Sequence, residues 1–221
     1  MKYSELEKYL FSIKDTKFAN FSKRLSNSEY VSIGVRNPTL RKLIKEHKND
    51  DELKLEDFYT GKYLEIDFIY FGLALFRANS IEKQLKFLMN NMKNGRSWVL
   101  TDCSQTYMKK CDFNTFIIFF KKMINSKYVY DRRFAYVFAI KFVKSPEISG
   151  VFRLIRQNED YMVMMAEAWF LATAAIYFPD EVYAYLKDLD DNVLKRKTIS
   201  KICESFRIRE EDKERAKQLR K

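Results

Sequence analysis

The chain has 221 residues, of which 47% are hydrophobic and 32% are charged, so it is globular and not disordered. It has five glycines and three prolines, where average usage would give about 15 and 11, and this scarcity argues against a turn-rich β-sandwich or barrel. The net charge is +11, which indicates a polyanionic partner, with nucleic acid the first candidate and a membrane surface the second.

Amphipathic segments separated by short polar breaks run the length of the chain, and they predict an all-α fold. The expected helices cover Tyr3–Ile13, Thr16–Leu25, Pro38–Glu46, Leu55–Thr60, Tyr63–Arg77, Ile81–Lys93, Trp98–Lys110, Phe113–Asn125, Tyr128–Val143, Ser149–Arg156, Tyr161–Phe178, Asp180–Lys187, Asn192–Phe206 and Glu210–Arg220. No linker rich in proline, glycine or serine divides them, so we expect a single domain over residues 1–221.

The helices between Tyr63 and Lys187 come in pairs, with a repeat of roughly 30 to 40 residues. Paired helices at this period predict an α-solenoid of HEAT-like repeats, which stack into a curved body with one concave face. A compact irregular bundle is the competing all-α interpretation.

Several helix boundaries have a local cause in the sequence. Asn37 is expected to cap a helix whose first residue is Pro38, and Asn79 with Glu82 has the spacing of a capping box. The pair Asn94–Gly95 is expected to end another helix.

The scarcity of residues that commonly bind metals limits the kinds of functional site that the chain can form. His47 is the only histidine, which excludes sites built from two or three histidines. The sequence has no phosphate-binding glycine loop, no zinc-protease motif and no serine-hydrolase elbow. We therefore expect no metal and no cofactor.

The cysteines and the N-terminus predict where the protein works. Cys103, Cys111 and Cys203 are odd in number and show no paired spacing, which is typical of a reduced intracellular protein. The N-terminus lacks a signal-peptide pattern. The longest apolar stretch, Tyr161–Phe178, carries Glu167 near its middle, so it is interpreted as a core helix and not as a membrane span. A cytoplasmic location is expected.

The stretch that begins at Arg96 is the most informative. On a helix, one apolar stripe facing the core would contain Leu100, Cys103, Tyr107 and Cys111. Trp98 and Asp102 are four residues apart and fall on roughly the opposite face, so a tryptophan would stand over a carboxylate outside the core. The alternative is that Trp98 packs against a neighbouring repeat and that Asp102 is an ordinary surface acid.

Two arginines lie near the start of a later apolar helix, where the helix dipole favours acids. A guanidinium matches phosphate oxygens, so Arg133 is a candidate phosphate-binding residue. A solvated pair or a salt bridge to Asp131 is the alternative, and for Arg132 it is the favoured one.

Trp169 lies in a helix that is apolar almost all round. Its stretch of methionines and aromatics is more often core than a binding surface, and lining a groove is the alternative.

Five segments of the sequence, in the same order along the chain, resemble the motifs of one protein family. They are Gly34-Val35-Arg36-Asn37-Pro38-Thr39-Leu40-Arg41, Glu65 with the Tyr70–Leu75 run, Ser97-Trp98 followed by Asp102, Arg133-Phe134-Ala135, and Met165-Ala166 with Ala168-Trp169. From about Tyr30 to the end, the chain resembles the AlkD-type DNA glycosylases of the HEAT-like DNA alkylation repair family.

This resemblance implies a right-handed superhelix whose basic concave cleft holds duplex DNA. Active members release cationic alkylated purines, such as 3-methyladenine and 7-methylguanine, without flipping the base into a pocket. Carried over, Asp102 would be the catalytic carboxylate, Trp98 and Trp169 would flank the deoxyribose, and Arg133 would hold a backbone phosphate.

Duplex DNA that contains alkylated purines is the expected partner, and the protein is expected to act as a monomer, without a membrane, a metal or a cofactor. A non-catalytic HEAT-like protein that binds DNA or RNA through the same basic groove is the alternative function, and a protein-interaction scaffold is a third.

Overall fold

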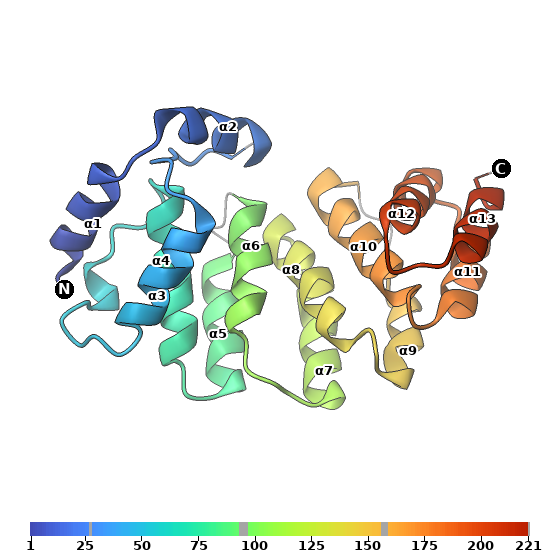
Figure 1. The fold of residues 1–221 in the computed structure, drawn as a ribbon. Helices are drawn as coiled ribbons and strands as arrows, with labels where there is room; N and C mark the ends of the chain where they lie inside the picture. Colours follow the sequence, from blue (N-terminus) through green and yellow to red (C-terminus); the bar gives the residue numbers. More distant parts are fainter. Residues whose placement is uncertain (27, 93–96, 156–158, 221) are drawn as a thin grey trace. The chain divides into compact units, whose positions relative to one another are not determined.

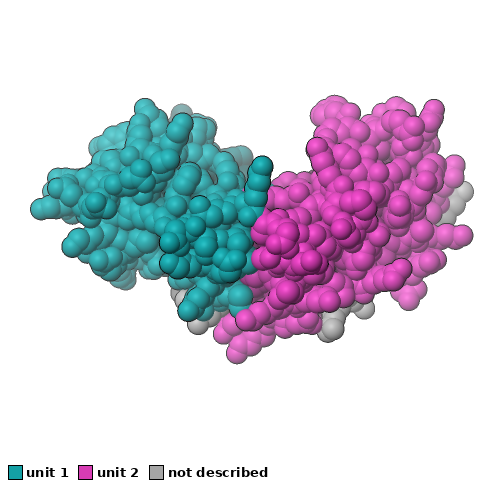
Figure 2. Space-filling view, turned by 90° about the horizontal axis from the view of Figure 1, so that it is seen from below, with its two compact units in different colours: residues 1–110 teal, residues 111–221 magenta. Residues whose placement is uncertain are grey.

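The computed structural model describes residues 1–26, 28–92, 97–155 and 159–220 (Figure 1). Within these ranges the regular structure is helical, apart from one isolated parallel β-bridge between Val31 and Tyr63. The all-α prediction is therefore confirmed. The chain divides into two compact units, residues 1–110 and residues 111–221 (Figure 2).

Unit 1 contains α1 (Tyr3–Ser12), α2 (Thr16–Ser26), α3 (Asn37–His47), the 3₁₀ turn η1 (Leu55–Asp57), α4 (Leu64–Arg77), α5 (Ile81–Asn91), α6 (Trp98–Ser104) and the 3₁₀ turn η3 (Gln105–Tyr107). Its central helix is α4, which packs against α3, α5 and α6 (Figure 1). Gly72 of α4 permits the close approach of α3, because an added Cβ would lie 2.4 Å from Cδ1 of Ile44.

A buried carboxylate at the start of α4 fixes the chain that precedes α3. Glu65 accepts hydrogen bonds from the backbone N–H groups of Ile33 at 2.9 Å and Gly34 at 2.8 Å, and from the hydroxyl of Ser32 at 2.9 Å. Gly34 has φ +96°, and an added Cβ would lie 2.1 Å from the carbonyl oxygen of Asp15, so this position requires glycine. Glu65 thereby satisfies donors that would otherwise be buried without a partner.

A second buried carboxylate in the same helix holds another loop. Asp67 accepts from the hydroxyl of Tyr30 at 2.7 Å and from the N–H of Gly61 at 2.8 Å. Gly61 has φ +89°, the left-handed conformation that glycine adopts most easily. The first turn of α4 therefore sets the course of two loops.

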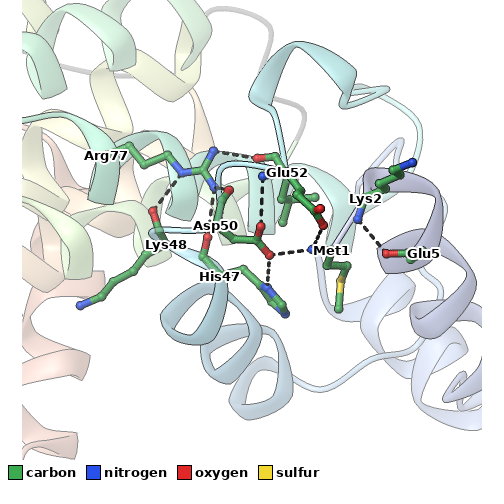
Figure 3. Close-up of polar contacts among 9 residues, drawn as sticks. Met1, Lys2, Glu5, His47, Lys48, Asp50, Glu52 and Arg77 are labelled. Atoms are coloured by element: carbon green, nitrogen blue, oxygen red, sulfur yellow. Dashed lines mark hydrogen bonds and ion pairs between the residues drawn. The ribbon is translucent and has the colours of Figure 1, made fainter.

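The last residue of α4 fastens the loop after α3. The guanidinium of Arg77 donates to the backbone carbonyls of His47, Lys48, Asp50 and Leu53 at 2.7 to 3.0 Å (Figure 3). Asp50 in this loop accepts from the Met1 amino group at 2.9 Å, and its Oδ2 lies 2.8 Å from Nδ1 of His47 (Figure 3). The single histidine is thus part of a structural contact.

Unit 2 contains α7 (Phe113–Ile124), α8 (Val129–Ala139), the 3₁₀ turns η4 (Ile140–Phe142) and η5 (Pro146–Ile148), α9 (Ser149–Phe152), α10 (Tyr161–Ala174), α11 (Pro179–Asp188), α12 (Asn192–Glu204) and α13 (Glu210–Gln218). Its centre is α10, which packs between α8 and α12 (Figure 1). Phenylalanines fill the contact between α7 and the α8–η4 segment, where Phe116 stacks on Phe142 with ring centroids 4.1 Å apart.

Several predicted helices are shorter in the structure, among them Tyr128–Val143, whose α-helical part ends at Ala139. Only one 3₁₀ turn, η1, forms in Leu55–Thr60, and α6 ends at Ser104 instead of Lys110. The helix after Pro146 ends at Phe152, and its predicted end at Arg156 lies outside the described residues. The helix that begins at Tyr161 ends at Ala174, four residues before Phe178.

A side chain of α5 accounts for the early end of α6. Gln84 is buried, and its amide group donates to the carbonyl of Tyr107 at 2.9 Å and accepts from the N–H of Lys109 at 2.7 Å. Met108 between them is extended, with φ −68° and ψ 131°. The prediction of a helix through Lys110 used periodicity alone, which carries no information about such a contact.

Two predicted caps are displaced by one residue. Arg36 precedes the first turn of α3, so Asn37 lies inside that helix, with Pro38 beside it. Ser80, and not Asn79, caps α5 by accepting from the N–H of Lys83 at 3.3 Å. The predicted helix end at Asn94–Gly95 lies outside the described residues. Among the helices in the described ranges, none is both long enough and apolar enough to cross a membrane.

Removal of the Glu65 carboxylate is expected to destabilise unit 1. Glu65→Ala leaves several loop N–H groups without their acceptor, which should lower the free energy of unfolding by about 3 kcal/mol. Urea denaturation measures this loss, with Glu56→Ala at an exposed position as the control. Equal unfolding midpoints for the two variants would show that Glu65 does not hold the loop.

The contact at Asp50 is expected to make the stability of the fold depend on pH in the acidic range. Hydrogen bonds from the Met1 amino group and from His47 lower the pKa of Asp50 from 3.8 to about 2. The ionised carboxylate therefore stabilises the fold above pH 3.8, and this contribution is lost as the pH falls towards 2. Between pH 4 and pH 2 the melting temperature of the Asp50→Asn variant should fall less than that of the unchanged protein or of Asp51→Asn. Parallel curves for all three proteins would contradict this.

Candidate functional site

Helix α6 presents the tryptophan and the carboxylate singled out in the sequence. Ser97 caps the helix, accepting from the N–H of Val99 at 3.2 Å, so Trp98 is the first helical residue. Trp98 and Asp102 are half-buried, one turn apart on the same helix, whereas the residues that face the core are Val99, Leu100, Thr101 and Ser104.

The predicted core stripe of α6 is correct only at Leu100. Cys103 and Tyr107 are half-buried, and Cys111 lies beyond the end of the helix. The stripe failed because it assumed a helix through Lys110. Burial raises the pKa of the Cys103 thiol to about 11, so this cysteine is protonated at neutral pH and is not a nucleophile.

Two polar side chains of this region, Thr101 and Arg41, were given no role in the site from the sequence. The hydroxyl oxygen of Thr101 lies 2.8 Å from Oδ1 of Asp102 and 2.7 Å from the carbonyl oxygen of Trp98. Its single hydrogen can therefore be donated to one of these two oxygens at a time. Arg41 reaches from α3 to Cys103, with 3.9 Å between Nη2 and Sγ. A hydroxyl therefore lies beside the carboxylate, and a cation lies beside the next residue, Cys103. Arg41 is the last residue of the sequence motif that begins at Gly34.

Trp98 lines a small apolar pocket within unit 1, of about 90 Å³. Phe18, Phe21 and Leu25 of α2 form one wall, and Leu40 of α3 contributes to another. Phe21 is 51% exposed and Leu25 is 58% exposed, so this wall presents apolar surface to solvent next to the tryptophan. Trp98 therefore packs partly against its own unit while one part of it stays accessible.

Arg133 is buried at the contact between α8 and α10. It is 7% exposed, and its Nη1 donates to the carbonyl of Met162 at 2.6 Å. Arg132 donates to the carbonyl of Ser126 at 2.9 Å, and Ser126 in turn donates through its hydroxyl to Asp131 at 2.6 Å. Both arginines thus have structural partners, and a phosphate contact at Arg133 stays a prediction.

Trp169 lies at the surface of α10, so of the two interpretations that the sequence left open for this tryptophan, the core interpretation is wrong. Its side chain is 37% exposed, although Ala168 and Phe170 on either side are completely buried. With Tyr161, Met165 and Thr173 it forms the accessible stripe of the helix, at a spacing of four residues. Lys197 of α12 lies 5.6 Å from the ring centre of Tyr161, which brings a cation to this stripe.

The four predicted site residues fall in both units. Trp98 and Asp102 are one turn apart in unit 1, and Arg133 and Trp169 lie on two packed helices of unit 2. Their convergence on one sugar stays a prediction. Over the described part of the chain, no three histidine, cysteine or acidic side chains are grouped closely enough to hold a metal ion.

The comparisons with known proteins identify the family. A family model described as DNA alkylation repair enzyme matches residues 6–206, so the chain belongs to this family. A solved structure titled "Predicted DNA alkylation repair enzyme from Enterococcus faecalis" is similar, with a TM-score of 0.67 and 16% identity over 87% of this chain and 98% of that one. No curated protein matches this chain. The HEAT-like α-solenoid class of the predicted fold is thereby confirmed.

The exposure of Trp169 predicts that it contributes little to stability. Trp169→Ala should lower the free energy of unfolding by about 1 kcal/mol or less, whereas Phe170→Ala at the adjacent buried position should lower it by about 3 to 5 kcal/mol. Chemical denaturation of both variants tests the difference. Losses of equal size would place Trp169 in the core.

Proposed function

We propose that this protein is a DNA glycosylase that hydrolyses the N-glycosidic bond of cationic alkylated purines in duplex DNA, without base flipping. The observation that carries the proposal is the Trp98–Asp102 pair, half-exposed on α6 of a chain that belongs to the DNA alkylation repair enzyme family. Substrates of this class include 3-methyladenine and 7-methylguanine.

The leaving group determines what the protein has to supply. A purine that carries a positive charge departs with the electron pair of its bond to C1′ and becomes neutral, so it needs no proton from a general acid. Positive charge develops on the deoxyribose as the bond breaks. The reaction therefore requires an anion near the sugar and a water molecule. The chain has a suitable carboxylate, and the reaction does not require a histidine.

Asp102 is proposed as the catalytic residue. Its carboxylate would stabilise the developing positive charge and orient the water molecule that attacks C1′, and the proton of that water passes to the carboxylate or to solvent. The hydroxyl of Thr101, 2.8 Å from Oδ1, supports this role because it is placed to donate a hydrogen bond that orients the carboxylate. Asp102 stays accessible because α6 turns its other face to the core.

The two tryptophans are proposed to flank the deoxyribose. Aromatic faces attract a neighbouring positive charge, which is the charge that the sugar acquires. The partial exposure of Trp98 and Trp169 supports contact with a ligand, since a fully buried ring would offer no face.

Arg133 is proposed to contact a backbone phosphate. A guanidinium matches phosphate oxygens, and that of Arg133 is held in place by its hydrogen bond to the carbonyl of Met162. With 7% of the residue exposed, a phosphate would reach only the edge of the group. The net charge of +11 supports duplex DNA as the partner, and a monomer suffices for the reaction.

The loss of the Asp102 carboxylate is expected to abolish base release while DNA binding is kept. Asp102→Asn should slow the release of 7-methylguanine from methylated duplex DNA by about 100-fold or more, because an amide cannot stabilise the positive sugar. Asp51→Asn, a matched change at an exposed position of unit 1, should leave the rate unchanged.

The outcome separates the proposed enzyme from its alternative. Equal rates of base release in Asp102→Asn and in the unchanged protein would remove Asp102 from the mechanism. If neither protein releases a base and both bind duplex DNA with a steep dependence on salt, the chain is a non-catalytic DNA-binding protein.

A further inference from the structure

We propose that unit 2 carries a second nucleic-acid contact, a basic and aromatic patch that binds single-stranded DNA. The patch consists of Lys144, Tyr177, Phe206 and Arg207, from the segments that follow η4, α10 and α12. None of these residues belongs to the proposed glycosylase site, so the inference goes beyond the proposed function and does not depend on it.

The loop after α12 holds a phenylalanine in solvent. Phe206 is 103% exposed, the highest value among the exposed large hydrophobic residues. The loop around it is fixed, because the N–H of Arg207 donates to the hydroxyl of Ser205 at 3.2 Å and Ile208 is buried with 5% exposure. The ring is therefore presented by an anchored loop and makes no packing contribution to the fold.

Two cations share one aromatic ring beside this loop. Arg207 donates to the hydroxyl of Tyr177 at 2.7 Å, and its guanidinium carbon lies 5.8 Å from the ring centre. The ammonium of Lys144 lies 5.5 Å from the same ring centre. The two positive charges are therefore no more than about 11 Å apart.

Neither cation has an acidic partner among the described residues. Over the residues that the structure describes, no carboxylate lies within 4.0 Å of Lys144 or Arg207. The neighbouring basic groups are paired instead, Lys201 with Glu204 at 2.7 Å and Arg209 with Asp212 at 3.0 Å. The carboxyl end of α10 favours cations nearby, but it gives no reason for the exposed Phe206.

The chemistry of the patch fits a nucleotide. A flat apolar ring next to cations that have no acidic partner among the described residues matches a base that stacks and a phosphate that carries charge. Such platforms bind single strands without sequence preference. A single strand is favoured over a duplex, because the faces of paired bases are already covered by stacking. A membrane or a protein surface would call for a broader apolar area than one side chain.

The experiment measures the affinity for a fluorescent oligothymidine of about 15 nucleotides by anisotropy, next to a duplex of the same length. Phe206→Ala should weaken binding to the single strand by roughly 10-fold, with little effect on the duplex. Removal of both cations, Lys144→Ala with Arg207→Ala, should lower the slope of log affinity against log salt by about 1.4, since each phosphate contact on a single strand contributes about 0.7.

Matched controls come from α7 of the same unit. Ile118→Ala removes another exposed apolar side chain, 71% exposed, and Lys121→Ala with Lys122→Ala removes two exposed cations. Both controls should bind the single strand like the unchanged protein.

Three results would overturn the inference. They are unchanged affinity of Phe206→Ala for the single strand, an equal loss for duplex and single strand, and a loss that the controls reproduce. Base release from methylated duplex DNA is measured in parallel and should be unchanged in Phe206→Ala. A protein that binds the single strand but releases no base would support the patch and contradict the proposed function.

Discussion

Unit 1 depends on one buried carboxylate, which accepts hydrogen bonds from several backbone N–H groups of a loop. Glu65 lies in the first turn of α4 and holds the segment from Ser32 to Val35 at 2.8 to 3.3 Å. That segment includes Gly34, whose left-handed backbone lies against the carbonyl of Asp15. The hydrogen bonds thereby place the start of α3 beside α2, and side chains of both helices line the pocket of Trp98.

The two units present their candidate residues in different ways. In unit 1, a short capped helix turns Val99 and Leu100 inward, which leaves Asp102 accessible one turn beyond Trp98. In unit 2, α10 is buried between α8 and α12 on most sides, and Trp169 lies on its accessible stripe. In both cases a rigid helix, rather than a loop, carries the aromatic group. A site of this kind loses little conformational entropy when a ligand binds.

The sequence was sufficient for most of the fold, because helical periodicity and the scarcity of glycine and proline are local properties. It was insufficient where a side chain from a distant part of the chain determines the end of a helix or the burial of a residue. Gln84 ends α6 early, through contacts 23 and 25 residues away in the chain. Arg133 was predicted from its chemistry, but its burial depends on α10, a partner that the sequence does not identify. Trp169 is exposed despite an apolar neighbourhood, because its helix packs on the other sides.

The central claim is that a carboxylate suffices for catalysis because the base leaves already charged. The direct test compares single-turnover base release from duplexes that contain either 7-methylguanine, a cationic base, or hypoxanthine, a neutral one. The account predicts release of the methylated base alone, since the proposed mechanism includes no general acid that protonates a neutral purine. Release of hypoxanthine at a similar rate would contradict this mechanism, and release of neither base would contradict the proposed activity.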